Sequence, residues 1–193
     1  MKSLRWLLVL VALSAAFVRA LAADAPVERT LRLDRSKSYV DVDVKATIGS
    51  FTGHLDRYEL TVPLEANGKI KDALLKFKFA DLHTGKPDRD AEMIKWLGGG
   101  EPEGSFDLGM LALAPDGQGQ ASGKLTFHGQ TQLVEFPVLV KAQDGIYTVT
   151  GKTTIDYRNW GLKKFRKFGV TSVDPDVTIR FQFVGALPVA AAE

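Results

Sequence analysis

Residues 39–45 read Tyr39-Val40-Asp41-Val42-Asp43-Val44-Lys45, an unbroken alternation of apolar and charged side chains. Because successive side chains of a β-strand point to opposite faces, this pattern predicts a strand with one buried and one solvated face. Similar alternation, some of it weaker, occurs in segments 51–62, 73–79, 105–113, 121–128, 133–141, 147–157 and 177–183. Turn sequences such as Asn67-Gly68 and Asp144-Gly145 separate these segments. The sequence therefore predicts an all-β protein of about eight antiparallel strands, mostly joined as hairpins.

One segment, Asp88–Leu97, breaks this two-residue period and is rich in helix-forming residues. Either aspartate in its first turn can cap a helix, and Gly98-Gly99-Gly100 is expected to end it. The apolar residues Met93, Trp96 and Leu97 would share one face of this helix. We therefore expect one short helical insertion in an otherwise all-β chain.

The composition limits the class of protein. The chain has 193 residues, of which 45% are hydrophobic and 25% charged. These values fit one globular domain and exclude a mostly disordered chain or a polytopic membrane protein. The chain has no cysteine, which excludes disulfide bonds and thiolate metal sites.

The N-terminus has the pattern of a secretory signal peptide. Lys2 and Arg5 precede an uncharged run, 6–18, and the small residues of Ala20-Leu21-Ala22 follow. A membrane-spanning helix needs about 20 apolar residues, so this run is too short for an anchor. We expect residues 1–22 to be removed and residues 23–193 to form a single exported domain. That domain carries almost equal numbers of basic and acidic residues, so its charge gives no reason to expect a nucleic-acid partner.

Eight antiparallel strands can close into a barrel or pack as a sandwich. An eight-stranded barrel is just wide enough to fill itself with side chains or to hold one small ligand. The inward-facing positions are rich in valine, leucine and phenylalanine, which suits both outcomes. Composition and periodicity do not decide between a barrel filled with side chains and a barrel that holds a ligand.

No group of residues predicts a reaction or a metal site. His54, His83 and His128 are far apart and have no metal-ligand spacing. The chain has no Gly-x-Ser-x-Gly sequence, which many serine hydrolases carry. Gly98-Gly99-Gly100 is not a phosphate-binding loop, because no Lys-Ser or Lys-Thr follows it. An enzyme acting through His128 or Tyr157 would need a second polar group inside the barrel. We expect no cofactor and no metal.

Residues Lys163–Phe168 contain four cations and two phenylalanines. We interpret this segment as a solvated loop whose phenylalanines cover one end of the barrel. The alternative is a transient contact with an anionic membrane surface, with the aromatic side chains at the interface. A homodimer, formed through Trp160–Phe168 or through an exposed strand edge, also remains open.

Several segments, in chain order, resemble the YceI-like family of exported, polyisoprenoid-binding barrel proteins. The matching sequences are Gly49-Ser50-Phe51-Thr52-Gly53, Thr84 followed by Arg89-Asp90, the hairpin sequence Gly123–Gly129, Thr154–Leu162 with its Trp160-Gly161, and Asp176–Ile179. They extend over most of the chain from about Val40 to Gly185. Glu92 and Tyr157 stand where the family often has histidine and arginine, and 97–105 lacks its usual paired aromatics.

This resemblance implies an eight-stranded antiparallel lipocalin-like barrel in the periplasm. It also implies an apolar cavity that holds a polyisoprenoid or an isoprenoid quinone for transport or storage, without catalysis. The residues expected to line the cavity are Val44, Phe77, Phe79, Phe106, Met110, Phe127, Phe136, Phe181 and Phe183. Met93 and Trp96 are expected to form a lid, which Arg89 and Asp90 would anchor. The alternative is an exported stress-response or interaction module with a filled barrel and a protein partner.

Overall fold

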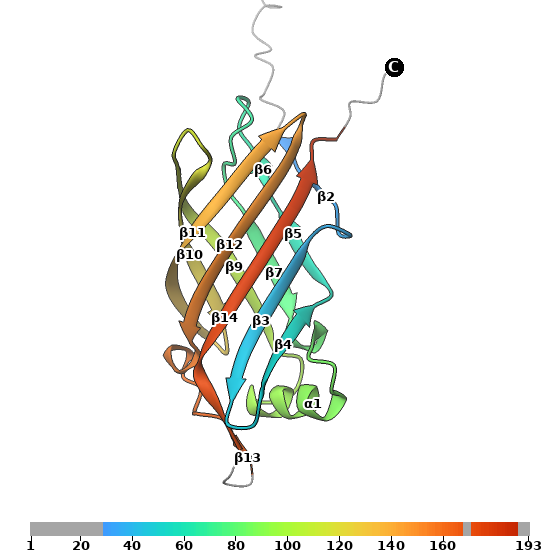
Figure 1. Ribbon diagram of the computed structural model, residues 1–193, viewed down its shortest axis with the longest axis vertical. Coiled ribbons are helices and arrows are strands. Elements are labelled where there is room, and N and C mark those ends of the chain that lie inside the picture. The colour runs from blue at the N-terminus through green and yellow to red at the C-terminus, as the bar shows by residue number, and fades with distance from the viewer. Residues whose placement is uncertain (1–28, 168–170, 189–193) are drawn as a thin grey trace, which may run out of the picture.

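The computed structural model describes residues 29–167 and 171–188, which form a curled antiparallel sheet with α1 at one end (Figure 1). The expected signal peptide, 1–22, and Phe168 lie outside these residues. The long strands are β3 (Tyr39–Ala46), β9 (Glu103–Leu113), β10 (Gln118–Phe127), β11 (Gln130–Gln143), β12 (Ile146–Asp156) and β14 (Thr171–Ala186). The shorter ones that complete the barrel wall are β4 (Ser50–Leu55), β5 (Tyr58–Thr61) and β7 (Leu74–Lys78).

Short segments pair with the ends of these strands. They are β1 (Arg29–Thr30), β2 (Arg32–Leu33), β6 (Pro63–Leu64), β8 (Leu82–His83) and β13 (Arg166–Lys167). The helical segments are α1 (Pro87–Trp96) and the 3-10 turns η1 (Phe79–Asp81) and η2 (Tyr157–Trp160). All eight predicted strand regions are strands in the structure. The structure has more strands than the eight predicted, because one predicted region, 51–62, is divided and because short strands pair at the ends of the barrel.

The divided region closes the sheet into a barrel. The main sheet has the order β5-β7-β9-β10-β11-β12-β14-β3-β4-β8, so β5 lies at one end and β4, paired with the two-residue β8, lies next to the other. Only Asp56 and Arg57 separate β4 from β5 in the chain. The bend between them is held by Asp81, whose carbonyl accepts the Asp56 N–H at 3.0 Å and whose carboxylate accepts Arg57 Nε at 2.8 Å. The kinked segment thus joins both ends of the sheet and completes a lipocalin-like barrel.

A register shift between β9 and β10 moves Met110 out of the barrel interior. One step along β10 changes the partner on β9 from Leu108 to Met110, so Gly109 has no register partner. The extra residue of such a β-bulge reverses which side chains point inward. Met110 is 51% exposed, and Leu111 faces the interior instead. The expectation that Met110 lines the interior is wrong, because strict alternation cannot anticipate a bulge.

The helix lies where the sequence predicts it, but its first turn is built differently. Pro87 occupies the first turn, and no side chain caps the helix at Lys86. The Asp90 carboxylate instead accepts the backbone N–H of Thr84 at 3.1 Å. The prediction of an aspartate cap is therefore wrong, because the helix begins at Pro87, directly after Lys86, and Asp90 bonds to Thr84 just before the helix. The glycines at 98–100 all have positive φ and end the helix as expected.

None of the helices that the structure describes, across 29–167 and 171–188, is long and apolar enough to span a membrane.

Candidate ligand-binding cavity

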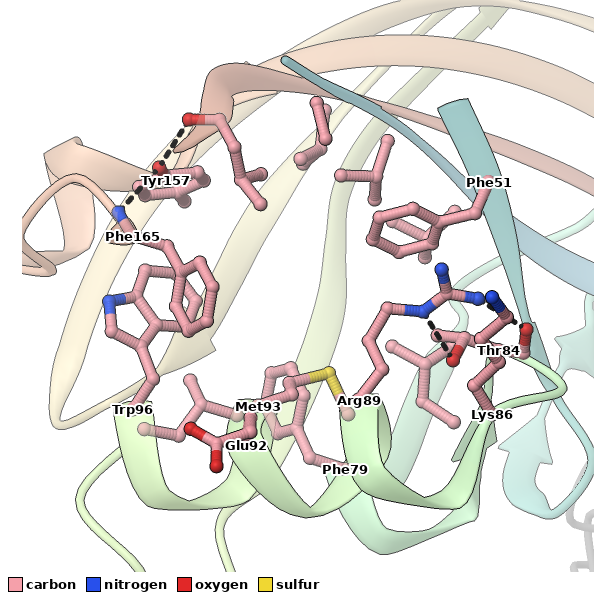
Figure 2. Close-up of a pocket in the computed structure, with 18 of the residues that line it drawn as sticks. Phe51, Phe79, Thr84, Lys86, Arg89, Glu92, Met93, Trp96, Tyr157 and Phe165 are labelled. Atoms are coloured by element: carbon pink, nitrogen blue, oxygen red, sulfur yellow. Dashed lines mark hydrogen bonds between the residues drawn. The ribbon is translucent and has the colours of Figure 1, made fainter. Parts of the chain in front are cut away.

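A cavity of about 620 Å³ occupies the end of the barrel where α1 lies. Its wall is built from the inner faces of β3, β4, β7, β10, β12 and β14, and α1 lies across one side of it (Figure 2). Most of the lining side chains are aliphatic or aromatic. Such a volume is within the range of about 300–1,000 Å³ that small-molecule sites usually have.

The structure brings six of the expected site residues together around this cavity. They are Val44, Phe77, Phe79, Met93, Trp96 and Phe127. These residues come from strands, a 3-10 turn and the helix, far apart in the chain. Sequence alternation places the strand residues on the inner face, but only the closed barrel makes them face one another.

Four other expected residues surround a second, smaller cavity of about 170 Å³ toward the opposite end of the barrel. They are Phe106, Phe136, Phe181 and Phe183, and Phe77 borders both cavities. Their rings contact one another in series, with centroid separations of 5.7, 5.6 and 5.3 Å. Aromatic packing therefore fills much of this half of the barrel, whereas the half beside α1 is open. Met110 borders neither cavity.

The helix presents one face to the larger cavity, with Arg89, Met93 and Trp96 directed into it (Figure 2). The Trp96 indole N–H donates to the carbonyl of Lys163 at 2.9 Å. The Trp96 ring also lies edge-on to Tyr157 and Phe165, with centroids 4.8 and 5.9 Å away. These contacts join the end of α1 to the loop after η2, so both segments form the rim together.

Arg89 ties the start of α1 to the chain after β8. Its Nε donates to the Thr84 hydroxyl at 2.8 Å, and its Nη2 donates to the Thr84 carbonyl at 2.7 Å. Thr84 in turn donates its hydroxyl to Asp90. The Arg89 guanidinium carbon lies 3.7 Å from the ring centroid of Phe51 on β4 (Figure 2). Arg89 therefore both anchors the helix and contributes a cation to the cavity wall, next to an aromatic ring.

The sequence analysis did not place several residues of this rim in the cavity wall: it expected Arg89 only to anchor the helix and Phe165 only to cover the barrel end. Phe51, Arg89 and Phe165 all line the larger cavity. Phe51 stands between Gly49 and Gly53, so the alternation of 49–53 could have indicated its inward face. No local signal indicates that Phe165 reaches the cavity, because its position depends on the contact with Trp96.

Tyr157 and His128 do not form a polar pair in the cavity. The Tyr157 hydroxyl accepts the backbone N–H of Phe165 at 3.2 Å and donates to the Val173 carbonyl at 3.3 Å. Burial raises the pKa of Tyr157 above its ordinary value. His128 lies exposed in a turn, with Nδ1 2.9 Å from the Trp160 carbonyl oxygen. Across residues 29–167 and 171–188, no three potential metal-ligating side chains come together.

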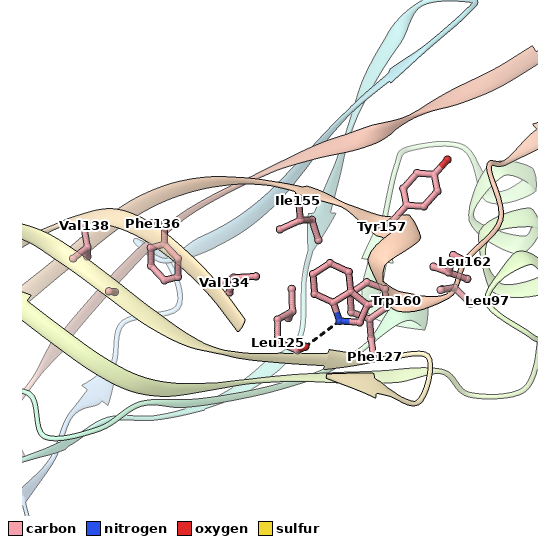
Figure 3. Close-up of a cluster of buried hydrophobic side chains, with 11 residues drawn as sticks. Leu97, Leu125, Phe127, Val134, Phe136, Val138, Ile155, Tyr157, Trp160 and Leu162 are labelled. Carbon is pink, nitrogen blue, oxygen red and sulfur yellow. Dashed lines mark hydrogen bonds between the residues drawn. The ribbon is translucent and has the colours of Figure 1, made fainter. Parts of the chain in front are cut away.

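A buried cluster supports the wall of the larger cavity from behind (Figure 3). Trp160 is 1% exposed and stacks on Phe127 with centroids 4.7 Å apart. Its indole N–H donates to the Leu125 carbonyl at 3.0 Å. Because Leu125 and Phe127 both line the cavity, this arrangement fixes the wall that they form. Trp160 is too deeply buried to contribute to the homodimer contact considered from the sequence.

The cavity opens beside the β3–β4 turn and the segment before α1. Ile48, at the tip of that turn, lines the cavity and is also 74% exposed. Lys86 borders the same opening and is exposed. The exposed cations of the loop that contains Phe165 are Lys163, Lys164 and Arg166. Phe165 is half-buried against Trp96, so this phenylalanine covers the barrel end as the sequence analysis expected.

A closed antiparallel barrel with one apolar, open-ended cavity and a helix at its rim belongs to the lipocalin-like class of binding folds. The YceI-like domain matches residues 31–185, and the chain belongs to this family. A comparison with curated protein sequences finds no significant match.

Solved structures of similar fold include BcnA from Burkholderia cenocepacia, with a TM-score of 0.66 and 18% identity over 79% of this chain and 99% of that one. A polyisoprenoid-binding domain from Saccharophagus degradans, implicated in plant cell wall breakdown, has a TM-score of 0.63 and 16% identity over 83% and 99% of the two chains. A YceI protein from Campylobacter jejuni has a TM-score of 0.57 and 15% identity over 75% and 88%. At these identities the likeness supports the fold.

Proposed function

We propose that this protein is a periplasmic carrier or reservoir for a polyisoprenoid or an isoprenoid quinone and that it acts by binding alone. The observation that carries the proposal is the apolar cavity of about 620 Å³, open at one end of the barrel. The family and the polyisoprenoid-binding domain of similar fold support this ligand class.

The chemistry of the wall suits such a ligand. An isoprenoid tail exposes hydrocarbon to water, and burying it contributes about 25 cal/mol per Å² without directional contacts. The flexible side chain of Met93 and the flat rings of Phe79 and Phe127 can adapt to a branched, kinked chain. A polar head group would remain at the opening, where Lys86 and Arg89 supply donors.

The alternative, an interaction module with a filled barrel, agrees with the packed aromatic half but not with the open half. The two proposals differ in what the purified protein contains. Native mass spectrometry of the mature protein, isolated from the periplasm without detergent, would detect a bound lipid, and organic extraction would identify it. A co-purifying isoprenoid supports the carrier. A bare protein that also takes up no added quinone or polyprenol would contradict the carrier and favour the interaction module.

We further propose that the open end contacts an anionic membrane surface during loading. Ile48 is the most exposed of the large apolar side chains that the described residues present, and it lines the same cavity as the cations Lys86 and Arg89. An exposed apolar tip with cations at the same end of the barrel favours the interface of an anionic bilayer. Ile146, 50% exposed, lies at the opposite end of the barrel, where β12 begins, and serves as a matched control (Figure 1). Ile48→Asp should weaken sedimentation with anionic phospholipid vesicles, whereas Ile146→Asp should not. Equal losses in both variants would contradict the proposal.

A further inference from the structure

The two apolar cavities of the barrel adjoin one another through a constriction. The larger one opens beside α1, and the smaller one lies toward the other end. Five residues line both cavities: Val40, Leu55, Phe77, Leu125 and Ile179. A ligand tail that enters from the opening beside α1 meets these residues before it reaches the smaller cavity.

Phe77 is the aromatic residue of this constriction, and the neighbouring strand sets its position. Phe77 on β7 is the register partner of Gly104 on β9. A Cβ atom on Gly104 would lie only 2.3 Å from Cζ of Phe77, so the ring occupies the space of the missing side chain. The ring also makes an edge contact with Phe79, with centroids 5.3 Å apart. Gly104 thus lets the Phe77 ring lie against the barrel wall and sets how far it enters the interior.

The smaller cavity is bounded in the same way. The Phe181 ring covers Gly151 on β12, where a Cβ atom would lie 2.4 Å from Cζ of Phe181. Phe181 stacks on Phe183 and meets Phe136 edge-on. Rings packed against backbone and against each other have little room to move. The smaller cavity therefore has few ways to widen for a longer tail.

The volumes translate into numbers of carbon atoms. An apolar protein cavity of about 150 Å³ binds one benzene molecule, so each carbon needs about 25 Å³. On this scale the larger cavity holds about 25 carbons and the smaller one about seven. About 25 carbons correspond to about five isoprene units, and seven to little more than one.

We propose that the larger cavity limits the buried tail to about five isoprene units and that Phe77, set by Gly104, determines this limit. The inference rests on the proposed function and adds tail length as the property that the site selects. Each buried methylene raises affinity about fourfold, so affinity should rise steeply up to five units. A longer tail must either displace the Phe77 ring or push its head group outward past the donors of Lys86 and Arg89, so affinity should fall once the tail exceeds this limit.

The test is a competition among tail lengths. The full mature protein, freed of lipid, is mixed with equimolar benzoquinones that carry two, four, five, six or eight isoprene units, and native mass spectrometry measures the occupancy of each. Occupancy should peak near five units, with the eight-unit tail at least about fivefold lower than this peak. Phe77→Leu should move the peak to about six units, since the two volumes then merge. Gly104→Ala should move it below five, because the added methyl group pushes the ring inward. Leu133→Ala, at an exposed position on β11, is the control and should leave the peak unchanged.

The outcomes separate the two proposals. If no tail binds at any length, the proposed function itself fails. If occupancy rises steadily to eight units, a tail is bound but the length limit is wrong. A peak near five units that moves in neither Phe77→Leu nor Gly104→Ala would overturn the role of these two residues.

Discussion

Phe79 offers the most direct test of the cavity wall, because its ring is half-buried and borders the larger cavity. It contacts the Phe77 ring edge-on and lies 5.7 Å from the Phe127 ring. Replacing a fully buried phenylalanine by alanine costs about 3–5 kcal/mol. Because this ring already faces open space, we expect Phe79→Ala to lower the free energy of unfolding by about 2 kcal/mol. In a domain of this size, that loss lowers Tm by about 4–8 °C.

The same substitution should weaken ligand binding by a separate amount. A phenylalanine side chain presents about 150–250 Å². If about a quarter of that area, about 50 Å², touches the ligand, its loss at 25 cal/mol per Å² removes about 1.3 kcal/mol. The dissociation constant for an isoprenoid quinone should therefore rise about tenfold.

Two measurements separate stability from binding. Circular dichroism during heating gives Tm, and quenching of tryptophan fluorescence by a benzoquinone with a four-unit tail gives the dissociation constant. Phe127→Leu tests a second wall position with a smaller loss of packing, and Leu133→Ala is the exposed control. Unchanged dissociation constants in both wall variants, with both proteins folded, would refute the assignment of these rings to the ligand site.

Three further predictions concern the support of the cavity, the position of the ligand and the response to acid. Trp160→Phe withdraws the buried indole N–H from the Leu125 carbonyl, and the free energy of unfolding in urea should fall by about 1–3 kcal/mol; an unchanged value would show that this hydrogen bond is dispensable. Trp96→Phe should abolish most of the fluorescence quenching by a bound quinone, because Trp96 lines the cavity and Trp160 lies behind its wall; quenching that survives would place the quinone elsewhere. A hydrogen bond from Arg180 lowers the pKa of Asp43 below its ordinary value of 3.8. The pair therefore stabilises the folded protein above about pH 4, and this stabilisation is lost as the pH falls through the lowered pKa. Asp43→Asn should cost less than about 1 kcal/mol at pH 7, since both side chains are over a third exposed, and the difference from the wild type should shrink as the pH falls below about 4; a constant difference at all pH values would exclude this titration.

The main features of the fold follow from local periodicity. Alternation of the kind seen in 39–45 requires an extended backbone with one face buried, so each strand is encoded within its own few residues. The helix is encoded in the same way, by a break in that period and by Gly98-Gly99-Gly100. These signals located all eight strand regions and α1, because they depend on neighbours in the chain.

Other features depend on contacts between distant segments and left no local pattern. The bulge at Gly109 places Met110 outside the barrel, although simple alternation places it inside. Phe165 joins the rim through its ring contact with Trp96, a residue 69 positions earlier in the sequence. Each depends on which strands and loops meet in the closed barrel.

The sequence by itself determined that apolar side chains cover one face of an antiparallel sheet. Whether that face encloses solid packing or open space was decided by tertiary structure alone. Phe181 and its neighbouring rings fill much of one half of the barrel, while the other half, beside α1, keeps a cavity of about 620 Å³. The physical reason is that packing depends on the directions of individual rings and on the backbone that they rest on, as with Phe77 over Gly104. Hydrophobic periodicity records which side chains are buried, but not how much space remains between them.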